Sequence, residues 1–175
     1  MRAEFGAGAW RVNIGDEPHQ GLDESRVVVD RLGDDDSREP VFVLVSAAAR
    51  APSLLVVGRV RASFSPGVHL VPETSTLFVG CSESLAVYDL EKAERTHLDL
   101  TPYAFTSWNR HGDIIVMSGE LEVAGYDLRG QRLWAATIEP PWDYGVQGDA
   151  MFTIAMGHKT EFSLREGPKG PLVAR

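Results

Sequence analysis

The histidines are the side chains of this sequence best suited to bind a metal ion or to transfer a proton. A zinc site needs several converging ligands, and an HExxH sequence on a helix is a common local source of two of them. No two of the five histidines stand at such a spacing. The sequence therefore predicts no metal site, and it favours solvated or hydrogen-bonding roles for His19, His69, His97, His111 and His158.

Motifs for nucleophilic catalysis and phosphate binding are also missing from the sequence. No Gly-x-Ser-x-Gly pattern occurs, so no serine is predicted on the strained turn that activates it in α/β hydrolases. Cys81 follows an apolar run, which favours a small core residue over a nucleophile. Gly6-Ala7-Gly8 lacks a flanking strand and helix for phosphate binding, and Asp34-Asp35-Asp36 lacks the ligand spacing of a calcium loop. The sequence thus favours a non-catalytic protein without a cofactor.

The most unusual local sequence is Glu139-Pro140-Pro141-Trp142-Asp143-Tyr144. Its two prolines restrict the backbone and lower the entropy cost of holding the two aromatic residues in place. Rigid exposed aromatics beside carboxylates are suited to recognising a protein or a ligand. The competing interpretation is that Trp142 packs into the interior while the prolines only turn the chain, because large aromatics are usually buried.

The negative net charge argues against a nucleic-acid partner. The chain has 17 Lys and Arg against 25 Asp and Glu, a net charge of −8, and a sequence pI of about 5.1. A protein that follows nucleic-acid phosphates normally has the opposite balance. No apolar run approaches the length of a membrane span, the N-terminal residues lack a signal-peptide core, and one cysteine excludes an internal disulfide. We therefore expect a cytoplasmic protein that binds neither nucleic acid nor a membrane.

A repeated hairpin pattern is the strongest structural signal in the sequence. Each copy has an apolar run, a short polar turn and a second run that ends near an aromatic residue. These aromatics, Tyr88, Tyr126 and Phe162, stand 38 and 36 residues apart, and a degenerate copy lies upstream at Val41–Val45 and Ser53–Val57. Short runs rich in Val, Ile, Phe and Tyr, bounded by Gly, Ser or Asp, predict strands rather than helices.

Further strands are predicted beside these hairpins, giving about four strands per repeat: Gly67–Val71, Thr96–Leu100, Tyr103–Trp108, Gln131–Ile138 and Tyr144–Gln147. Repeats of this kind form the blades of a β-propeller. We expect one all-β domain over 1–175, with four-stranded units at about 26–64, 67–100, 103–138 and 142–174. A strand at 9–14 is expected to close the ring beside Leu172-Val173, because closure removes unpaired sheet edges. The alternative from the same hairpins is an antiparallel β-sandwich or barrel.

One segment, residues 121–138 (LEVAGYDLRGQRLWAATI), resembles a blade of the quinoprotein-like (pyrroloquinoline-quinone-repeat) and related β-propellers. In those repeats, aspartate, glycine and tryptophan at this spacing mark the third and fourth strands of a blade. The matching positions here are Tyr126, Asp127, Gly130 and Trp134. The preceding repeat keeps Tyr88-Asp89-Leu90 without the tryptophan, and the last keeps Phe162 and Gly167. The quinone-dependent enzymes have larger rings and a cofactor site that this sequence does not supply, so the resemblance implies a blade-like fold and no quinone.

Stacked blades would gather their second-to-third-strand turns and the links between blades at one end of the molecule. That end would present six residues: Glu83, Glu120, Trp142, Asp143, Tyr144 and His158. We expect this acidic and aromatic face to bind another protein with a basic surface, as an immunity or inhibitor-type protein does. The alternative is a small-ligand-binding protein or hydrolase, with Glu120, Asp143 and His158 as acid–base groups in a cleft. The sequence leaves a monomer and a homodimer equally open.

Overall fold

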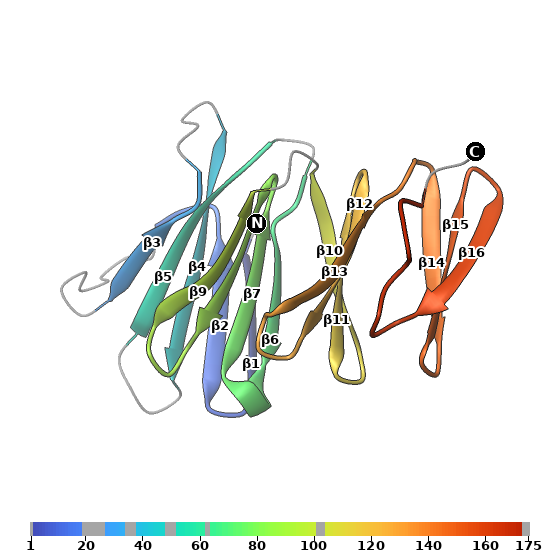
Figure 1. The fold of residues 1–175 in the computed structure, drawn as a ribbon. Helices are drawn as coiled ribbons and strands as arrows, with labels where there is room; N and C mark the ends of the chain where they lie inside the picture. Colours follow the sequence, from blue (N-terminus) through green and yellow to red (C-terminus); the bar gives the residue numbers. More distant parts are fainter. Residues whose placement is uncertain are drawn as a thin grey trace.

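The chain folds into four β-sheets that stack side by side in an open row (Figure 1). The computed structural model describes residues 2–18, 27–33, 38–47, 52–61, 64–100 and 104–172. His19 and Asp34-Asp35-Asp36, which the sequence left without a functional role, lie outside the described residues. The all-β, propeller-like prediction is confirmed, because each sheet packs against the next through its face rather than forming a two-sheet sandwich.

Sheet 1 has the strand order β1-β2-β4-β5-β3. Its strands are β1 (Arg2–Ala7), β2 (Trp10–Gly15), β3 (Val28–Arg31), β4 (Glu39–Ala47) and β5 (Pro52–Val60). All of its neighbouring strands are antiparallel except β3 and β5, which run parallel.

Sheets 2, 3 and 4 are simple antiparallel meanders, in which each strand pairs with the next along the chain. Sheet 2 contains β6 (Gly67–Val71), β7 (Thr76–Cys81), β8 (Ser84–Asp89) and β9 (Glu94–Leu100). Sheet 3 contains β10 (Phe105–His111), β11 (Ile114–Gly119), β12 (Glu122–Asp127) and β13 (Arg132–Thr137). Sheet 4 contains β14 (Trp142–Gln147), β15 (Ala150–Ala155) and β16 (His158–Ser163).

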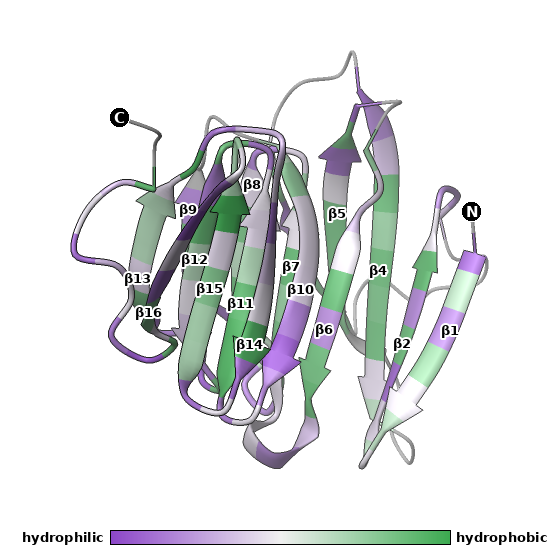
Figure 2. Cartoon of the chain, turned by 90° about the vertical axis from the view of Figure 1, so that its right-hand side faces the viewer, coloured by the Kyte–Doolittle hydropathy of each residue, from purple (hydrophilic) through white to green (hydrophobic). Residues whose placement is uncertain are grey.

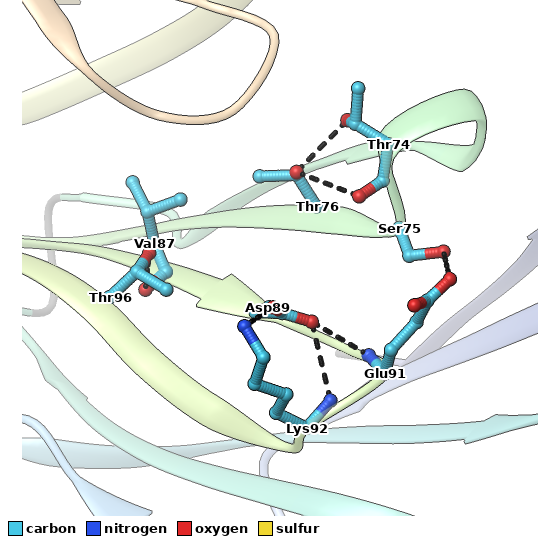
Figure 3. Close-up of polar contacts among 8 residues, drawn as sticks. All are labelled: Thr74, Ser75, Thr76, Val87, Asp89, Glu91, Lys92 and Thr96. Carbon is cyan, nitrogen blue, oxygen red and sulfur yellow. Dashed lines mark hydrogen bonds and ion pairs between the residues drawn. The ribbon is translucent and has the colours of Figure 1, made fainter.

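The turns that end the third strands are built in the same way in successive sheets. In sheet 2 the Asp89 carboxylate accepts hydrogen bonds from the backbone N–H groups of Glu91 and Lys92, at 3.0 and 3.2 Å (Figure 3). In sheet 3 the carboxylate of Asp127 accepts from two backbone N–H groups of the following turn, each at 2.9 Å. Ser163 takes this position in sheet 4, where its hydroxyl accepts from the N–H of Glu166 at 3.2 Å. A short polar side chain that bonds its own backbone stops the strand and fixes the turn.

Three apolar cores join the four sheets. The first lies between sheets 1 and 2 and includes Val43, Val56 and Leu77. The second lies between sheets 2 and 3, and the third lies between sheets 3 and 4. Each inner sheet contributes alternate residues of one strand to two different cores, since neighbouring side chains on a strand point to opposite faces. In β7, for example, Val79 belongs to the first core and Phe78 to the second.

The three repeated aromatics occupy equivalent places, as the spacing predicts. Tyr88, Tyr126 and Phe162 lie on the third strand of their sheets, each opposite an apolar residue of the second strand. Tyr88 and Tyr126 also pair with an arginine of the fourth strand, Arg95 and Arg132, next to a β-bulge in both cases. The same register at the same bulge shows that sheets 2 and 3 are structural repeats.

Tyr88 makes a polar contact with the preceding sheet. The hydroxyl of Tyr88 donates to the Asp30 carboxylate of sheet 1 at 2.7 Å, and Arg95 donates to both oxygens of that carboxylate at 3.1 Å. Desolvation is the main reason why the pKa of Tyr88 is raised, and the bond to Asp30 adds to it. The hydroxyl thus stays protonated and donates, and it ties the rims of two sheets together.

The next two interfaces vary this arrangement. Beside Tyr126, Asp99 of sheet 2 pairs with Arg132, and burial together with the Asp99 charge raises the pKa of Tyr126. At the third interface the hydroxyl is missing, because Phe162 replaces the tyrosine. The residue in the register position of Asp99 is Ala136 there. The third interface therefore has neither an acidic residue nor a tyrosine hydroxyl at these positions, and the contact there is apolar.

The N-terminal strand does not close a ring. β2 contains most of the predicted strand at 9–14, and it pairs with β1 and β4 within sheet 1. Leu172 instead forms a bridge with Ile138 of sheet 3, and Val173 lies outside the described residues. Sheets 1 and 4 lie at opposite ends of the row (Figure 1). The prediction that the N-terminal strand closes a ring was wrong. β2 pairs instead with β4, an apolar strand that is much closer to it in the sequence than the last sheet.

Strand counts differ from four in the first and last sheets. Sheet 1 gains the hairpin of β1 and β2, and sheet 4 has three strands among the described residues. The helical content of the described residues is a single 3-10 turn at Pro72–Thr74. Within the described part of the chain, therefore, no helix has the length and apolar composition that crossing a membrane requires.

Candidate binding surface at one end of the array

Three loops meet at the end of sheets 3 and 4 that is uppermost in Figure 1. They are the turn between β11 and β12, the link between β13 and β14, and the turn between β15 and β16. We call their exposed and half-buried residues, with the adjoining strand ends, the end surface. It comprises Glu120, Glu139, Pro140, Pro141, Trp142, Asp143, Met156 and His158.

Hydrogen bonds hold these loops against one another. The indole N–H of Trp142 donates to the carbonyl oxygen of Glu120 at 3.1 Å, which joins the link to the β11–β12 turn. The backbone N–H of Met156 donates to the carbonyl of Pro141 at 3.3 Å, which joins the link to the β15–β16 turn. The backbone N–H of Glu120 in turn donates to the carbonyl of Ala104 at 2.8 Å. The end surface is therefore preorganised, which lowers the entropy cost of binding.

The two aromatics of the link, for which the sequence left exposed and packed positions open, are partly buried in the structure. Trp142 and Tyr144 are half-buried and pack against the core between sheets 3 and 4, with their rings 6.3 Å apart. Both follow the same face of β14, because residues two apart on a strand point the same way. The hydroxyl of Tyr144 lies 3.4 Å from Nε2 of His111, and burial is the main reason why its pKa is raised. Trp142 is thus only partly exposed at the end surface.

The carboxylates of the end surface are exposed, and among the described residues none of them has a cation within ion-pair distance. Glu120, Glu139 and Asp143 form no ion pair with any residue that the structure describes, although Asp143 accepts a hydrogen bond from the backbone N–H of Tyr144 at 2.7 Å. Lys159, which follows His158, lies with its ammonium group over the ring of Phe152, at 4.6 Å from the centroid, and 3.7 Å from the carboxylate of Glu161. The end surface therefore presents uncompensated negative charge beside exposed apolar side chains, of which Met156 is 55% exposed.

Glu83 differs from the other predicted site residues. It lies in the β7–β8 turn of sheet 2, where Arg38 and Arg61 of sheet 1 both contact its carboxylate, Arg61 at 2.7 Å. Two arginines neutralise this carboxylate and fix it to the neighbouring sheet. Its place in the structure is therefore that of a tie between sheets, and it does not share the uncompensated charge of the end surface.

A hollow of about 570 Å³ lies at the opposite end of sheets 3 and 4. Its walls include His111, Asp113, Asp149 and Arg165. None of Glu120, Asp143 and His158, the acid–base set of the alternative hypothesis, lines this hollow. Burial lowers the pKa of His111, which makes its neutral form the main one near neutral pH. Among the described residues, no three His, Cys, Asp or Glu side chains are grouped as metal ligands.

Cys81 is a core residue in the structure, packed between sheets 1 and 2 and 1% exposed. Burial raises the pKa of its thiol to about 12, so the nucleophilic thiolate is scarce in the native protein. We expect the folded protein to react with a thiol reagent such as DTNB only slowly at mildly alkaline pH. In concentrated guanidinium chloride the single cysteine should react at once, and equally fast labelling in both states would contradict this prediction.

Several contacts of the structure were not recognised from the sequence. Arg38 and Arg61 had no assigned role, and neither did the pairs of Asp30 with Tyr88 and Asp99 with Arg132. A signal for part of this arrangement was present, because an arginine follows each repeated tyrosine by six or seven residues. The acidic partners lie in the preceding sheet, and no local pattern marks them.

No protein-family model matches the chain, and no curated protein matches it in sequence. Solved structures of β-propeller proteins are similar in fold. BamB from Moraxella catarrhalis is 16% identical over 93% of this chain and 54% of its own, with a TM-score of 0.48. The computationally designed protein Ika8 is 11% identical over 94% of this chain and 58% of its own, with a TM-score of 0.48.

Sqt1 from Saccharomyces cerevisiae is 15% identical over 71% of this chain and 40% of its own, with a TM-score of 0.45. The chain thus spans between 40% and 58% of the length of these three proteins. At such identities a likeness concerns the fold alone. The order of the strands and the stacking of the sheets make this chain an all-β, propeller-like array of blades.

Proposed function

We propose that this chain is a non-catalytic protein-binding module whose end surface engages a basic segment of another protein. The observation that carries the proposal is the combination of three uncompensated carboxylates, Glu120, Glu139 and Asp143, with loops that hydrogen bonds already hold in place. Electrostatic complementarity of this kind steers association and suppresses partners of the wrong charge. The exposed Met156 and the prolines add apolar contact area in the middle of the charges.

Other features support binding over catalysis. The thiol of Cys81 is buried and protonated, and the acid–base candidates do not line the hollow at the other end of the sheets. An immunity or inhibitor-type role, in which the chain masks a basic surface of its partner, is the subtype that we favour. The alternative of a small ligand or a hydrolytic reaction would need a cleft at the end surface itself.

Affinity purification with matched charge variants tests this proposal. The wild-type protein is compared as bait with the triple variant Glu120→Gln/Glu139→Gln/Asp143→Asn, which removes the charges and keeps the shapes of the side chains. A control variant, Glu94→Gln/Asp149→Asn/Glu166→Gln, removes the same charge from exposed residues elsewhere. A protein retained by the wild type and the control is then purified for calorimetry at low and high salt.

The triple variant should bind the retained protein at least about tenfold more weakly, and the control within about twofold of the wild type. Affinity should fall as salt rises, because exposed charges are screened. If no protein is retained preferentially by the wild type, the proposed function is wrong. It is also wrong if the affinity for a retained protein is the same for the triple variant as for the wild type and does not change with salt.

A further inference from the structure

Among the residues that the structure describes, no fourth strand pairs with the third strand of sheet 4. In sheets 2 and 3 the third strand pairs with a fourth, β9 or β13. The described residues beyond β16 form only one bridge with β16 itself, between Ser163 and Gly167. The chain then crosses to sheet 3, where the N–H of Leu172 donates to the carbonyl of Thr137 at 2.8 Å. Figure 2 views the row from this end, with sheet 4 in front.

The backbone groups along this edge can be assigned. The N–H of Gly167 donates to the carbonyl of Ser163 at 2.9 Å, so the backbone of Ser163 points away from β15. Since this direction alternates along a strand, Lys159 and Glu161 also direct their N–H and C=O groups outward. No backbone hydrogen bond from a described residue reaches these outward groups. Residues 158–161 are all exposed, which leaves the groups accessible to another strand.

The charged side chains on this edge of β16 can pair with those of a second, antiparallel copy of the same strand. A lone lysine on an edge strand usually discourages pairing. Here Lys159 and Glu161 have opposite charges and stand two residues apart, and within one copy their side chains lie 3.7 Å apart and remain exposed to a second strand. An antiparallel second copy centred on Thr160 places each lysine opposite the glutamate of the other copy. Lys159 and Glu161 are then the hydrogen-bonded pairs, which agrees with their outward backbone groups. Moving the centre by one residue places Lys159 opposite itself, or Glu161 opposite itself, and both arrangements repel.

We propose that β16 pairs edge to edge with β16 of a second copy of this chain, about a twofold axis at Thr160. Two three-stranded sheets then form one continuous sheet, held by the outward backbone groups of Lys159 and Glu161 and by two cross-strand ion pairs. His158 of each copy lies opposite Phe162 of the other. Because the strands are antiparallel, the two end surfaces face opposite directions, and one dimer can hold two partner molecules.

Charge reversal tests the partner and the register together. Analytical ultracentrifugation should show a dimer for the wild type, and Lys159→Glu and Glu161→Lys should each weaken dimerisation at least about tenfold, because both symmetric pairs become repulsive. A mixture of the two single variants should recover dimers, since every cross-strand pair is then attractive. This recovery also shows that each variant is folded. Lys169→Glu, the same charge change at another exposed residue, should leave the dimer unchanged.

A disulfide test fixes the centre of the pairing. Residues opposite each other in a non-hydrogen-bonded pair have Cα atoms about 4.5 Å apart, within the range of a disulfide. Thr160→Cys should therefore form a covalent dimer under mild oxidation, while Thr137→Cys, an exposed residue of sheet 3, should not. The native Cys81 is 1% exposed and does not compete.

The outcomes separate clearly. Dimers that respond to the single reversals and recover on mixing support the proposal. The proposal is overturned if the wild-type protein stays monomeric at high concentration, or if Lys159→Glu leaves the dissociation constant of the dimer unchanged. His158 belongs both to the end surface and to this edge, but the carboxylates that carry the proposed function, Glu120, Glu139 and Asp143, lie outside β16. Failure here therefore leaves the proposed function to its own test.

Discussion

Replacing Trp134 by alanine should lower the free energy of unfolding by about 3–5 kcal/mol, the range for removing a large aromatic from a packed core. Trp134 is 8% exposed and lies in the core between sheets 3 and 4. Its indole N–H donates to the carbonyl of Leu164 at 2.8 Å, and its ring meets that of Phe162 edge-on at 5.6 Å. Since domains of this size are stable by only about 5–15 kcal/mol, the expected loss is a large part of the total.

Two glycines explain why this ring is difficult to replace. A Cβ atom on Gly125 would lie 2.5 Å from the indole, and one on Gly167 would lie 2.3 Å from it. The ring therefore lies between two backbone segments, one in β12 and one in the turn after β16. Removing the ring leaves a cavity that neither backbone can fill, because both segments are held by their own hydrogen bonds.

Urea denaturation followed by circular dichroism measures this effect. The control is Trp134→Phe, which keeps an aromatic ring but leaves the Leu164 carbonyl without its donor. We expect it to lose about 1–3 kcal/mol, as for one unsatisfied buried group. A loss below about 1 kcal/mol for Trp134→Ala would mean that sheet 4 contributes little to the cooperative unit.

Gly130→Ala is the second change with a large expected effect, a loss of about 2–5 kcal/mol in the free energy of unfolding. Gly130 lies in the turn between β12 and β13 with φ of +85°, a region that costs residues with a Cβ atom about 1–2 kcal/mol. A Cβ atom there would also lie 2.3 Å from a methyl carbon of Val87 in sheet 2. Overpacking of this kind costs about 1–3 kcal/mol, and it would push the turn away from the neighbouring sheet.

A second glycine with the same backbone provides the matched control. Gly112 has φ of +63°, and a Cβ atom there would meet nothing within 4 Å. Gly112→Ala should therefore show the backbone cost alone, about 1–2 kcal/mol. In the background of Val87→Ala, the cost of Gly130→Ala should fall towards that value. Equal losses for the two glycine variants in the wild-type background would show that the contact with Val87 relaxes without cost.

The two substitutions act on different interfaces between sheets, so we expect them to affect partner binding to different degrees. Trp134 holds sheet 4 and its turns against sheet 3, and the end surface is formed by loops of both sheets. Gly130 holds a turn of sheet 3 against sheet 2, at the opposite end of the array. Partner binding at the end surface should therefore be more sensitive to Trp134→Ala than to Gly130→Ala, at temperatures where both variants are folded.

Local patterns in the sequence determined much of the fold. The repeated hairpins around Tyr88, Tyr126 and Phe162 form the second and third strands of sheets 2, 3 and 4. Polar turns at Asp89 and Asp127 end the third strands of sheets 2 and 3. These elements were predictable because strand, turn and strand are neighbours in the chain, and alternation along each strand sets its register.

The order of strands and turns in the sequence also predicted part of the end surface. A meander of short strands must bring its alternate turns to one end, so Glu120, the Pro140-Pro141 link and His158 were expected together. The structure joins the first two through the bond from Trp142 to the Glu120 carbonyl. How far Trp142 and Tyr144 are buried was left open by the sequence, because a half-buried ring and an exposed one give the same residue pattern.

Only the tertiary structure decided the contacts between distant segments. The N-terminal strand joins β4 instead of the last sheet, and the chain beyond β16 turns back to Ile138. Among the described residues, one edge of β16 is therefore left without a partner strand. Glu83 is neutralised by two arginines that precede it by 45 and 22 residues. Such pairings depend on which surfaces meet once the sheets stack, and that choice is made by the summed packing of whole faces, which no short stretch of sequence encodes.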